Sequence, residues 1–305
     1  MGNQYAVGGG SGRGAWLLSN PVGAIFWVAA QAAYEGIGPS NNNDGLSPKR
    51  PLSTIAQALT NCVTGRGDRI ILMPGTYAIT AALAVTKNAV EIYSWLPKAA
   101  VISSADTTGA AKMFTVDSND VVLDGMTFSC GDQVTHGIDI ANTAAANRIA
   151  VRGNTLLGAG AVSTAIGIQI GDGTNDGADV EIYDNIIDRF KYAVQWDGTR
   201  PRVLENNIII PSTAGAGGIH VPAGRSSIGE RSYGVFLFNR VVGTENAGSK
   251  LAMIFSGAEA SQPLFLFADN YLANCASMTA DIHPEGVLAN YTGTPTTSLP
   301  SLITG

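Results

Sequence analysis

One short pattern recurs six times along this chain and limits its fold more than any other feature. The pattern is an apolar residue, any residue, an apolar residue, two further residues, an Asn or Gly, any residue, and an apolar residue. The copies are VVLDGMTF (121–128), IAVRGNTL (149–156), VEIYDNII (180–187), RVLENNII (202–209), GVFLFNRV (234–241) and FLFADNYL (265–272). Repeats of about 20 to 50 residues are typical of solenoids, in which each repeat buries its apolar face against its neighbours.

The spacing between copies and the strands that follow them predict the type of solenoid. The equivalent positions are 29, 31, 22, 32 and 31 residues apart, at Gly125, Asn154, Asn185, Asn207, Asn239 and Asn270. A second segment with strict apolar alternation follows each copy, which is the pattern of a strand. Asn tolerates a left-handed backbone, and its amide can bond to the Asn of the next coil. We therefore predict an all-β fold, a right-handed parallel β-helix of about seven or eight coils.

A single helical pattern stands near the start of the predicted solenoid. In Leu52–Val63 the apolar positions fall at helical spacing, and Ser53 is a plausible N-cap. One helix cannot cover both faces of a sheet, but it can plug the open core of the first coil. We expect residues 36–290 to form the β-helix, 1–35 an N-terminal arm with an apolar lead-in, and 291–305 a C-terminal tail.

Composition excludes several classes of partner. The net charge is −6 without a basic run, which argues against binding to nucleic acid or to an anionic membrane. The apolar stretch 16–34 is interrupted by Asn20 and Pro21, and no basic cluster precedes it, so neither a signal peptide nor a membrane span is predicted. We expect synthesis in a host cytoplasm. The three cysteines are far apart, which argues against a disulfide framework.

The segments GPSNNNDGLSPKRPLSTIAQAL (38–59) and GDRIILMPGTY (67–77) carry a resemblance to a known family. They resemble the N-terminal cap signature of the pectate-lyase-like β-helix superfamily, and the repeats extend this resemblance over about residues 36–290. The resemblance implies a context of sugar handling or of a virion surface. Its members include polysaccharide lyases and hydrolases, epimerases, adhesins, and phage tailspikes and other virion proteins.

A column of polar residues is predicted on one outer strand face. Alternation in the second strands turns their polar residues away from the core, and these are Asp139, Gln169, Gln195, His220 and, after an apolar coil, His283. A glycoside hydrolase needs two carboxylates in one groove. This column has one, so we expect a polar ladder that is solvated or contacts a partner, and no catalytic residues there.

The best acidic cluster lies elsewhere. If the protein is an enzyme, Glu181, Asp184 and Asp197 are the candidate catalytic residues, although interleaved arginines and lysines favour surface ion pairs. Asp172, Asp176 and Asp179 are spaced like ligands of Ca²⁺. Turn chemistry alone explains these residues, so we predict no cofactor and keep calcium as the alternative.

Apolar residues on both faces of the late strands predict an interface. A monomeric solenoid buries only its inward face, so outward apolar side chains need another cover. The alternative is a β-bulge that shifts the register of these strands and turns the apolar side chains into the chain's own core. The expected interface residues are Val235, Leu237, Leu264, Leu266, Met253, Trp16 and Phe26. We expect a homo-oligomer, most simply a trimer.

These observations lead to three hypotheses of function. The first is a structural virion protein, a phage capsid decoration or tail-associated β-helix, whose N-terminal arm attaches to the major capsid protein or another virion protein. The second is a polysaccharide lyase or depolymerase that uses the acidic cluster. The third is a glycan-binding adhesin, whose exposed aromatic residues would be Tyr183, Tyr192 and Trp196.

Overall fold

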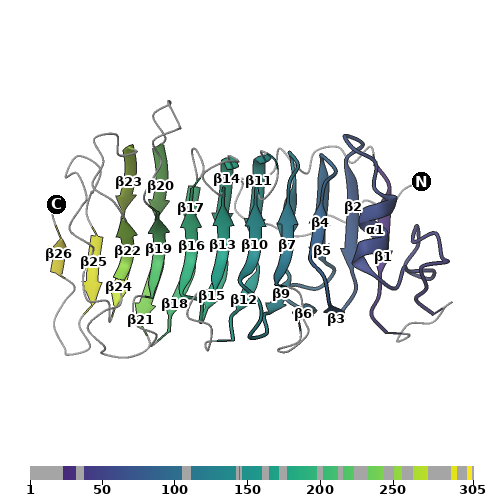
Figure 1. Cartoon of the computed structure of the whole chain (residues 1–305), viewed down its shortest axis with the longest axis horizontal. Coiled ribbons are helices and arrows are strands. Elements are labelled where there is room, and N and C mark those ends of the chain that lie inside the picture. Colours follow the sequence, from purple (N-terminus) through teal and green to yellow (C-terminus); the bar gives the residue numbers. More distant parts are fainter. Residues whose placement is uncertain are drawn as a thin grey trace.

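The chain folds into a right-handed parallel β-helix with one capping helix, in agreement with the prediction (Figure 1). The computed structural model describes residues 23–31, 38–104, 111–141, 144, 146–159, 165–171, 177–197, 202–211, 216–222, 233–243, 251–255, 264–273, 290–293 and 301–303. Within these ranges, no helix is long and apolar enough to cross a membrane. The strands form three sheets that run the length of a rod (Figure 1).

From β2 to β24 the chain passes through the three sheets in the repeating order A, B, C. Sheet A contains β1 (Ile25–Val28), β2 (Asp68–Leu72), β5 (Val90–Ser94), β8 (Val122–Asp124), β11 (Ala146–Arg152), β14 (Gly177–Tyr183), β17 (Arg202–Leu204), β20 (Tyr233–Leu237) and β23 (Leu264–Ala268). Sheet C contains β4 (Leu83–Val85), β7 (Lys112–Val116), β10 (His136–Ile140), β13 (Ile166–Ile170), β16 (Tyr192–Trp196), β19 (Gly217–Val221) and β22 (Leu251–Phe255).

Sheet B is the third side of the β-helix. It contains β3 (Gly75–Ile79), β6 (Ala100–Ser104), β9 (Thr127–Ser129), β12 (Thr155–Leu157), β15 (Ile186–Asp188), β18 (Asn207–Ile210), β21 (Arg240–Gly243), β24 (Tyr271–Ala273), β25 (Asn290–Gly293) and β26 (Ser301–Ile303). All of its strand pairs are parallel except β25 with β26, which is antiparallel.

Stacked apolar columns form the core. The inward column of sheet A is Phe26, Ile70, Ile92, Leu123, Val151, Ile182, Val203 and Phe236, in register from coil to coil. Every member is at most 5% exposed. Full burial of a side chain of this size stabilises the fold by about 1.5 to 3 kcal/mol. The coils therefore hold together because like positions stack on like.

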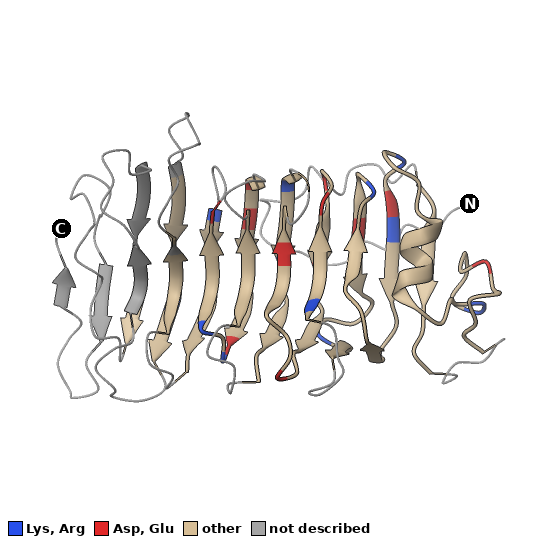
Figure 2. Ribbon diagram, viewed as in Figure 1, with Lys and Arg blue, Asp and Glu red and all other residues tan. Residues whose placement is uncertain are grey.

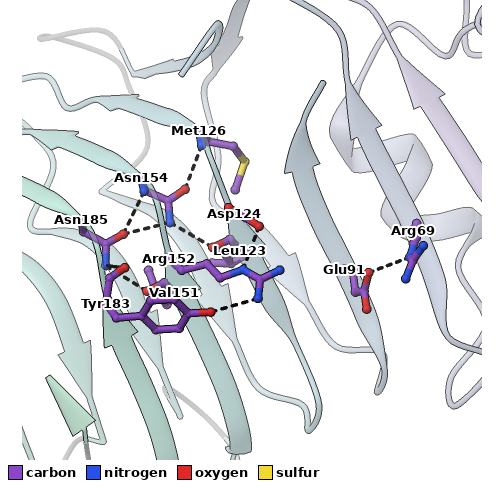
Figure 3. A network of polar contacts seen from close by, with 10 residues as sticks. All are labelled: Arg69, Glu91, Leu123, Asp124, Met126, Val151, Arg152, Asn154, Tyr183 and Asn185. Carbon is purple, nitrogen blue, oxygen red and sulfur yellow. Dashed lines mark hydrogen bonds and ion pairs between the residues drawn. The ribbon is translucent and has the colours of Figure 1, made fainter. Parts of the chain in front are cut away.

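An asparagine ladder fastens the corner between sheets A and B. Its members are Asn154, Asn185, Asn206, Asn239 and Asn270, all at most 1% exposed. Each Oδ1 accepts from the backbone N–H of the preceding coil, and for Asn185 and Asn206 these distances are 3.0 Å. Each Nδ2 donates to a carbonyl of a sheet A strand, as Asn185 does to Val151 at 2.9 Å (Figure 3).

The ladder corrects three details of the sequence prediction. Gly125 corresponds to Gly153 and not to Asn154, and Met126 takes the ladder position of its coil, where its backbone N–H donates to Asn154 Oδ1 at 2.9 Å. Asn206, and not Asn207, is the ladder member, because Asn207 begins β18 and its side chain is exposed. The left-handed residue is also not the Asn itself but the one before it. This position has a φ between 52° and 69° in six coils, and it is occupied by Gly125, Gly153, Asp184, Glu205, Phe238 and Asp269.

Helix α1 (Ile55–Asn61) covers the first coil at one end of the rod (Figure 1). It is shorter than predicted, and its N-cap is Thr54, whose side chain accepts from the backbone N–H of Gln57 at 3.2 Å. Ser53, the predicted cap, donates instead to Asn41 Oδ1 at 2.9 Å. Ile55, Ala58 and Leu59 are buried against the core. The plug function predicted for this helix agrees with its position.

Candidate functional site

Sheet C carries the polar column that the sequence predicted. Its strands place Asp139, Gln169, Gln195 and His220 in one register, as expected from their alternation. The column is not solvated, however, because Asp139, Gln169 and His220 are 3%, 5% and 8% exposed. His283 lies outside the described residues. Buried polar groups need partners, so the contacts of this column decide what it can do.

A second column runs three residues earlier on the same strands and contacts the first. It contains Lys112, His136, Ile166, Tyr192 and Gly217. Lys112 Nζ bonds to Asp139 Oδ2 across one coil at 2.6 Å, and its side chain stays 30% exposed. His136 lies in register beside Lys112 and contacts Thr135 Oγ1 through Nδ1 at 2.9 Å. Burial lowers the pKa of His136. The nearby Asp139 carboxylate raises this pKa, and the Lys112 ammonium lowers it further.

An aromatic pair forms the next part of the face. The rings of Tyr192 and His220 stack with centroids 4.1 Å apart. His220 Nδ1 also contacts Gln195 Oε1 at 2.8 Å. Burial, with a smaller contribution from Lys191, lowers the pKa of His220 to about 4. The imidazole is therefore neutral at pH 7, and Lys191 lies near it with Nζ 5.1 Å from the Tyr192 ring centroid.

Gln169 lies between these two groups with one unsatisfied atom. Its Nε2 donates to the carbonyl of Gly171. Its Oε1 is buried and has no hydrogen-bond donor among the described residues. A buried acceptor without a donor costs about 1 to 3 kcal/mol, so native proteins seldom keep one. Ile166 is the neighbouring member of the second column and is 8% exposed. The face thus places the apolar Ile166 beside an acceptor that has no donor among the described residues.

The outer face of sheet A carries a different network, which the sequence prediction missed. Arg69 bonds to Glu91 at 2.7 Å, and Arg152 bonds to Asp124 at 2.8 Å and to the Tyr183 hydroxyl at 3.0 Å (Figure 3). Burial raises the pKa of the Glu91 carboxyl, and Arg69 opposes this effect. Figure 2 shows acidic and basic bands on neighbouring strands rather than a patch of one sign.

The predicted catalytic set does not lie on one face. Glu181 is on β14 of sheet A and pairs with Arg202 at 2.9 Å. Asp184 is exposed at the corner between β14 and β15, and Asp197 follows β16 of sheet C. The ion pair that the interleaved arginines favoured is present for Glu181. The arrangement provides no shared groove for a carboxylate pair.

The remaining predicted site residues have mixed positions. Asp172 and Asp176 lie outside the described residues, and Asp179 is exposed at the start of a coil with φ 53°. In the part of the chain that the structure describes, no group of three His, Cys, Asp or Glu side chains is placed to hold a metal ion. Of the adhesin aromatics, Trp196 is fully buried, while Tyr183 and Tyr192 lie on different sheets. They share no groove.

The predicted interface residues fall into three groups. Val235 and Leu237 are half-buried on the outer face of sheet A, as the prediction requires. Phe26 is 5% exposed and packs in the core of its own chain, because alternation in β1 turns it inward. It is therefore not available to a partner. Trp16 and the side chains of Met253, Leu264 and Leu266 lie outside the described part.

Comparisons with known proteins identify the fold. No family model matches this chain, and no curated protein matches it. Among solved structures, pectate lyase Pel9A matches with a TM-score of 0.55 at 14% identity, over 83% of this chain and 64% of that one. A pectin methylesterase variant in complex with a hexasaccharide gives 0.53 at 12%, over 91% of both chains. The pectin methylesterase of Aspergillus niger gives 0.52 at 11%, over 91% and 83%.

At these identities the likeness establishes the fold alone. The structural neighbours are pectate-lyase-like parallel β-helix proteins, and their names indicate that they act on polysaccharides. This chain spans about two thirds of the length of pectate lyase Pel9A, at 64%. It spans most of the length of the two methylesterases.

Proposed function

We propose that this protein binds an acidic polysaccharide and seats one uronate residue on the outer face of sheet C. The observation that carries the proposal is the buried Gln169 Oε1, which has no donor among the described residues. A sugar hydroxyl is a donor of suitable size, and it can accept a second hydrogen bond at the same time. The proposal also agrees with the names of the structural neighbours, which include a pectate lyase and two pectin methylesterases.

The surroundings of Gln169 match the two sides of a pyranose ring. Ile166, in register between His136 and Tyr192, offers an apolar contact for ring carbons. Polar side chains on the adjacent coils, Asp139 and Gln195, lie in register with Gln169. A mostly apolar floor with a few fixed polar groups is typical of small-ligand sites. Lys112, His136, Tyr192 and Gln195 keep part of their surface exposed, so a ligand can contact the rim of the face from solvent. Because Gln169 Oε1 is buried, the proposed hydrogen bond to it requires the cover over that atom to open when the sugar binds.

Charge favours an acidic sugar over a neutral one. Lys112 and Lys191 contribute two cations, and Asp139 contributes one carboxylate. Both histidines of the face have lowered pKa values, with that of His220 at about 4. They are neutral at pH 7, so this group of side chains carries a net positive charge. A uronate carboxylate complements it.

Calorimetric titration with a galacturonate hexasaccharide tests the proposal. We expect Gln169→Met to weaken binding roughly tenfold, because the hydroxyl loses its acceptor while the buried volume is kept. Lys112→Met should weaken binding and flatten its dependence on salt. Asn207→Ala, which removes an exposed amide on sheet B, is the matched control and should change nothing. Unchanged binding in Gln169→Met, or no binding by the parent protein, would contradict the proposal.

The virion hypothesis stays a prediction. Residues 1–22 and 32–37 of the predicted N-terminal arm lie outside the described residues, while Ile25–Val28 form β1 of sheet A. A trimer, attachment through the arm and a place on a phage particle stay predictions. The solved structures named above favour glycan binding over that interpretation. The two roles are compatible, because a virion β-helix can also bind a glycan.

A further inference from the structure

An aromatic pair lies at the surface of the cap end of sheet A. Trp95 and Leu96, which follow β5, are 49% and 51% exposed, and Ile25 on β1 is 38% exposed. Trp27 lies beside Trp95 with ring centroids 5.1 Å apart. Large apolar side chains at the surface cost solvation, and a cluster of them marks an interaction site more often than a scatter does. Two adjacent indoles are such a cluster.

This pair continues into a track along the outer face of sheet A. The register places Trp27, Ile71, Tyr93, Asp124, Arg152 and Tyr183 in one column from coil to coil. Ile71 is 2% exposed between the aromatic residues on either side of it, while the others keep part of their surface free. The track therefore has aromatic groups at both ends and fixed polar groups between them.

The polar groups of the track are held rigid and are balanced in charge. Arg152 bonds to both Asp124 and Tyr183, so its guanidinium has one orientation (Figure 3). On the same face Arg69 pairs with Glu91, and Arg202 pairs with Glu181. Each cation thus has an anion beside it. Such a face has no long-range attraction for a charged polymer, but it offers donors and acceptors to hydroxyl groups.

We propose that the outer face of sheet A, from Trp27 to Tyr183, binds an uncharged polysaccharide chain that lies along the axis of the rod. Neighbouring strands are about 4.8 Å apart, which is close to the length of one hexopyranose in an extended chain, so successive sugars meet successive coils. The indole and phenol faces pack against the C–H faces of the rings. Arg152, Asp124 and Glu91 bind the hydroxyl groups.

A polysaccharide fits this face better than a protein partner does. Extended peptides add to the exposed edge of a sheet, where backbone donors and acceptors are free. The face of sheet A presents side chains only, since its backbone groups are bonded to the neighbouring coils. This surface is separate from the sheet C site, so the inference goes beyond the proposed function and does not depend on it.

Tryptophan fluorescence and calorimetry with cellohexaose, mannohexaose and maltohexaose test the inference in the full chain. We expect at least one of the three to bind and to shift the emission of the parent protein. Trp95→Ala should weaken that binding roughly tenfold, because one aromatic contact is lost. Leu46→Ala, which changes another exposed apolar side chain at the cap end, should bind like the parent. Gln169→Met should also bind these sugars like the parent, which separates the two faces.

Three results would overturn the inference. The first would be that none of the three hexasaccharides binds the parent protein. The second would be that Trp95→Ala binds the sugar as tightly as the parent does. The third is a parent protein that is oligomeric by light scattering and becomes monomeric in Trp95→Ala, which would assign the surface to a second copy of the chain.

Discussion

Sheets A and C stack their strands in the same way, yet their outer faces differ in how polar groups are satisfied. On sheet A the described charges are paired with one another, as in Arg69 with Glu91 and Arg152 with Asp124. On sheet C the polar column is more deeply buried, and Gln169 Oε1 has no donor among the described residues. The charged groups of sheet A thus satisfy one another, whereas the sheet C column keeps one buried acceptor to which the proposed sugar hydroxyl would donate.

The two faces also differ in the direction of their pKa shifts. Burial lowers the pKa of the sheet C histidines, to about 4 for His220. Burial raises the pKa of Glu91 on sheet A. Each shift favours the neutral form, because the charged form loses hydration on burial. The comparison can therefore be tested by substitution and by pH.

The largest expected loss of stability comes from removing the cation of the buried ion pair on sheet C, and the exposed ion pair on sheet A supplies the comparison. Lys112→Met leaves the Asp139 carboxylate, whose side chain is 5% exposed, without this cation. We expect the free energy of unfolding to fall by about 3 kcal/mol. Arg202→Met on sheet A breaks a pair whose arginine is 58% exposed, and it should cost less than about 1 kcal/mol. Urea denaturation at pH 7 measures both, and equal losses would remove the distinction between the faces.

Acidification should act on the two faces in opposite directions. The pKa of His220 is about 4 in the folded chain and about 6.5 in the unfolded one, so the unfolded state binds the proton first. Stability is lost as pH falls from about 6.5 to about 4, by roughly 3 kcal/mol for this residue. His220→Gln should remove that part of the pH dependence. We would measure urea midpoints of parent and variant at pH 7 and pH 4.5.

Glu91 supplies the contrasting case. The pKa of the Glu91 carboxyl is raised in the folded state, so the protonated carboxyl stabilises the fold relative to the ionised one. This contribution to the free energy of unfolding is present at low pH and is lost as pH rises through the folded-state pKa. Glu91→Gln should therefore make the protein lose more stability on acidification than the parent does, where His220→Gln makes it lose less. Shifts of the same sign in the two variants would contradict the comparison.

The smallest expected loss of stability comes from a single substitution in the hydrogen-bond network of sheet A. Tyr183→Phe removes the hydroxyl that accepts from Arg152 at 3.0 Å, while the Arg152 pair with Asp124 remains. We expect a loss of about 0.5 to 1 kcal/mol, because the site is half-buried and water can replace the hydroxyl. Thermal unfolding followed by circular dichroism measures this. A loss several times larger would mean that sheet A, too, depends on a coupled network.

The sequence predicted the architecture because the coils repeat. Alternation around Ile138, Ile168 and Val194 was sufficient to place Asp139, Gln169 and Gln195 in one outward column, and their register agrees. The same reasoning failed where a copy was ambiguous. In the run Glu205-Asn206-Asn207-Ile208 two asparagines compete for the ladder position, and the spacing to the inward residues Val203 and Ile208 selects Asn206.

The contacts between coils could not be predicted to the same degree. Arg152 reaches Asp124, which is 28 positions earlier, and Tyr183, which is 31 positions later. The loops between strands differ in length, so the register of one coil on the next does not follow from spacing alone. Burial of the sheet C column was missed for a related reason, since alternation separates inward from outward but does not show what covers the outward face. That Gln169 Oε1 has no donor among the described residues could not be predicted from the sequence.

A crystal structure of the parent protein with a galacturonate disaccharide would show whether the outer face of sheet C binds a uronate. We expect a sugar ring over Ile166, with one hydroxyl within hydrogen-bond distance of Gln169 Oε1 and the carboxylate near Lys112 or Lys191. An ordered water at Gln169 Oε1 with no sugar on sheet C would contradict this expectation, as would a sugar bound on sheet A only.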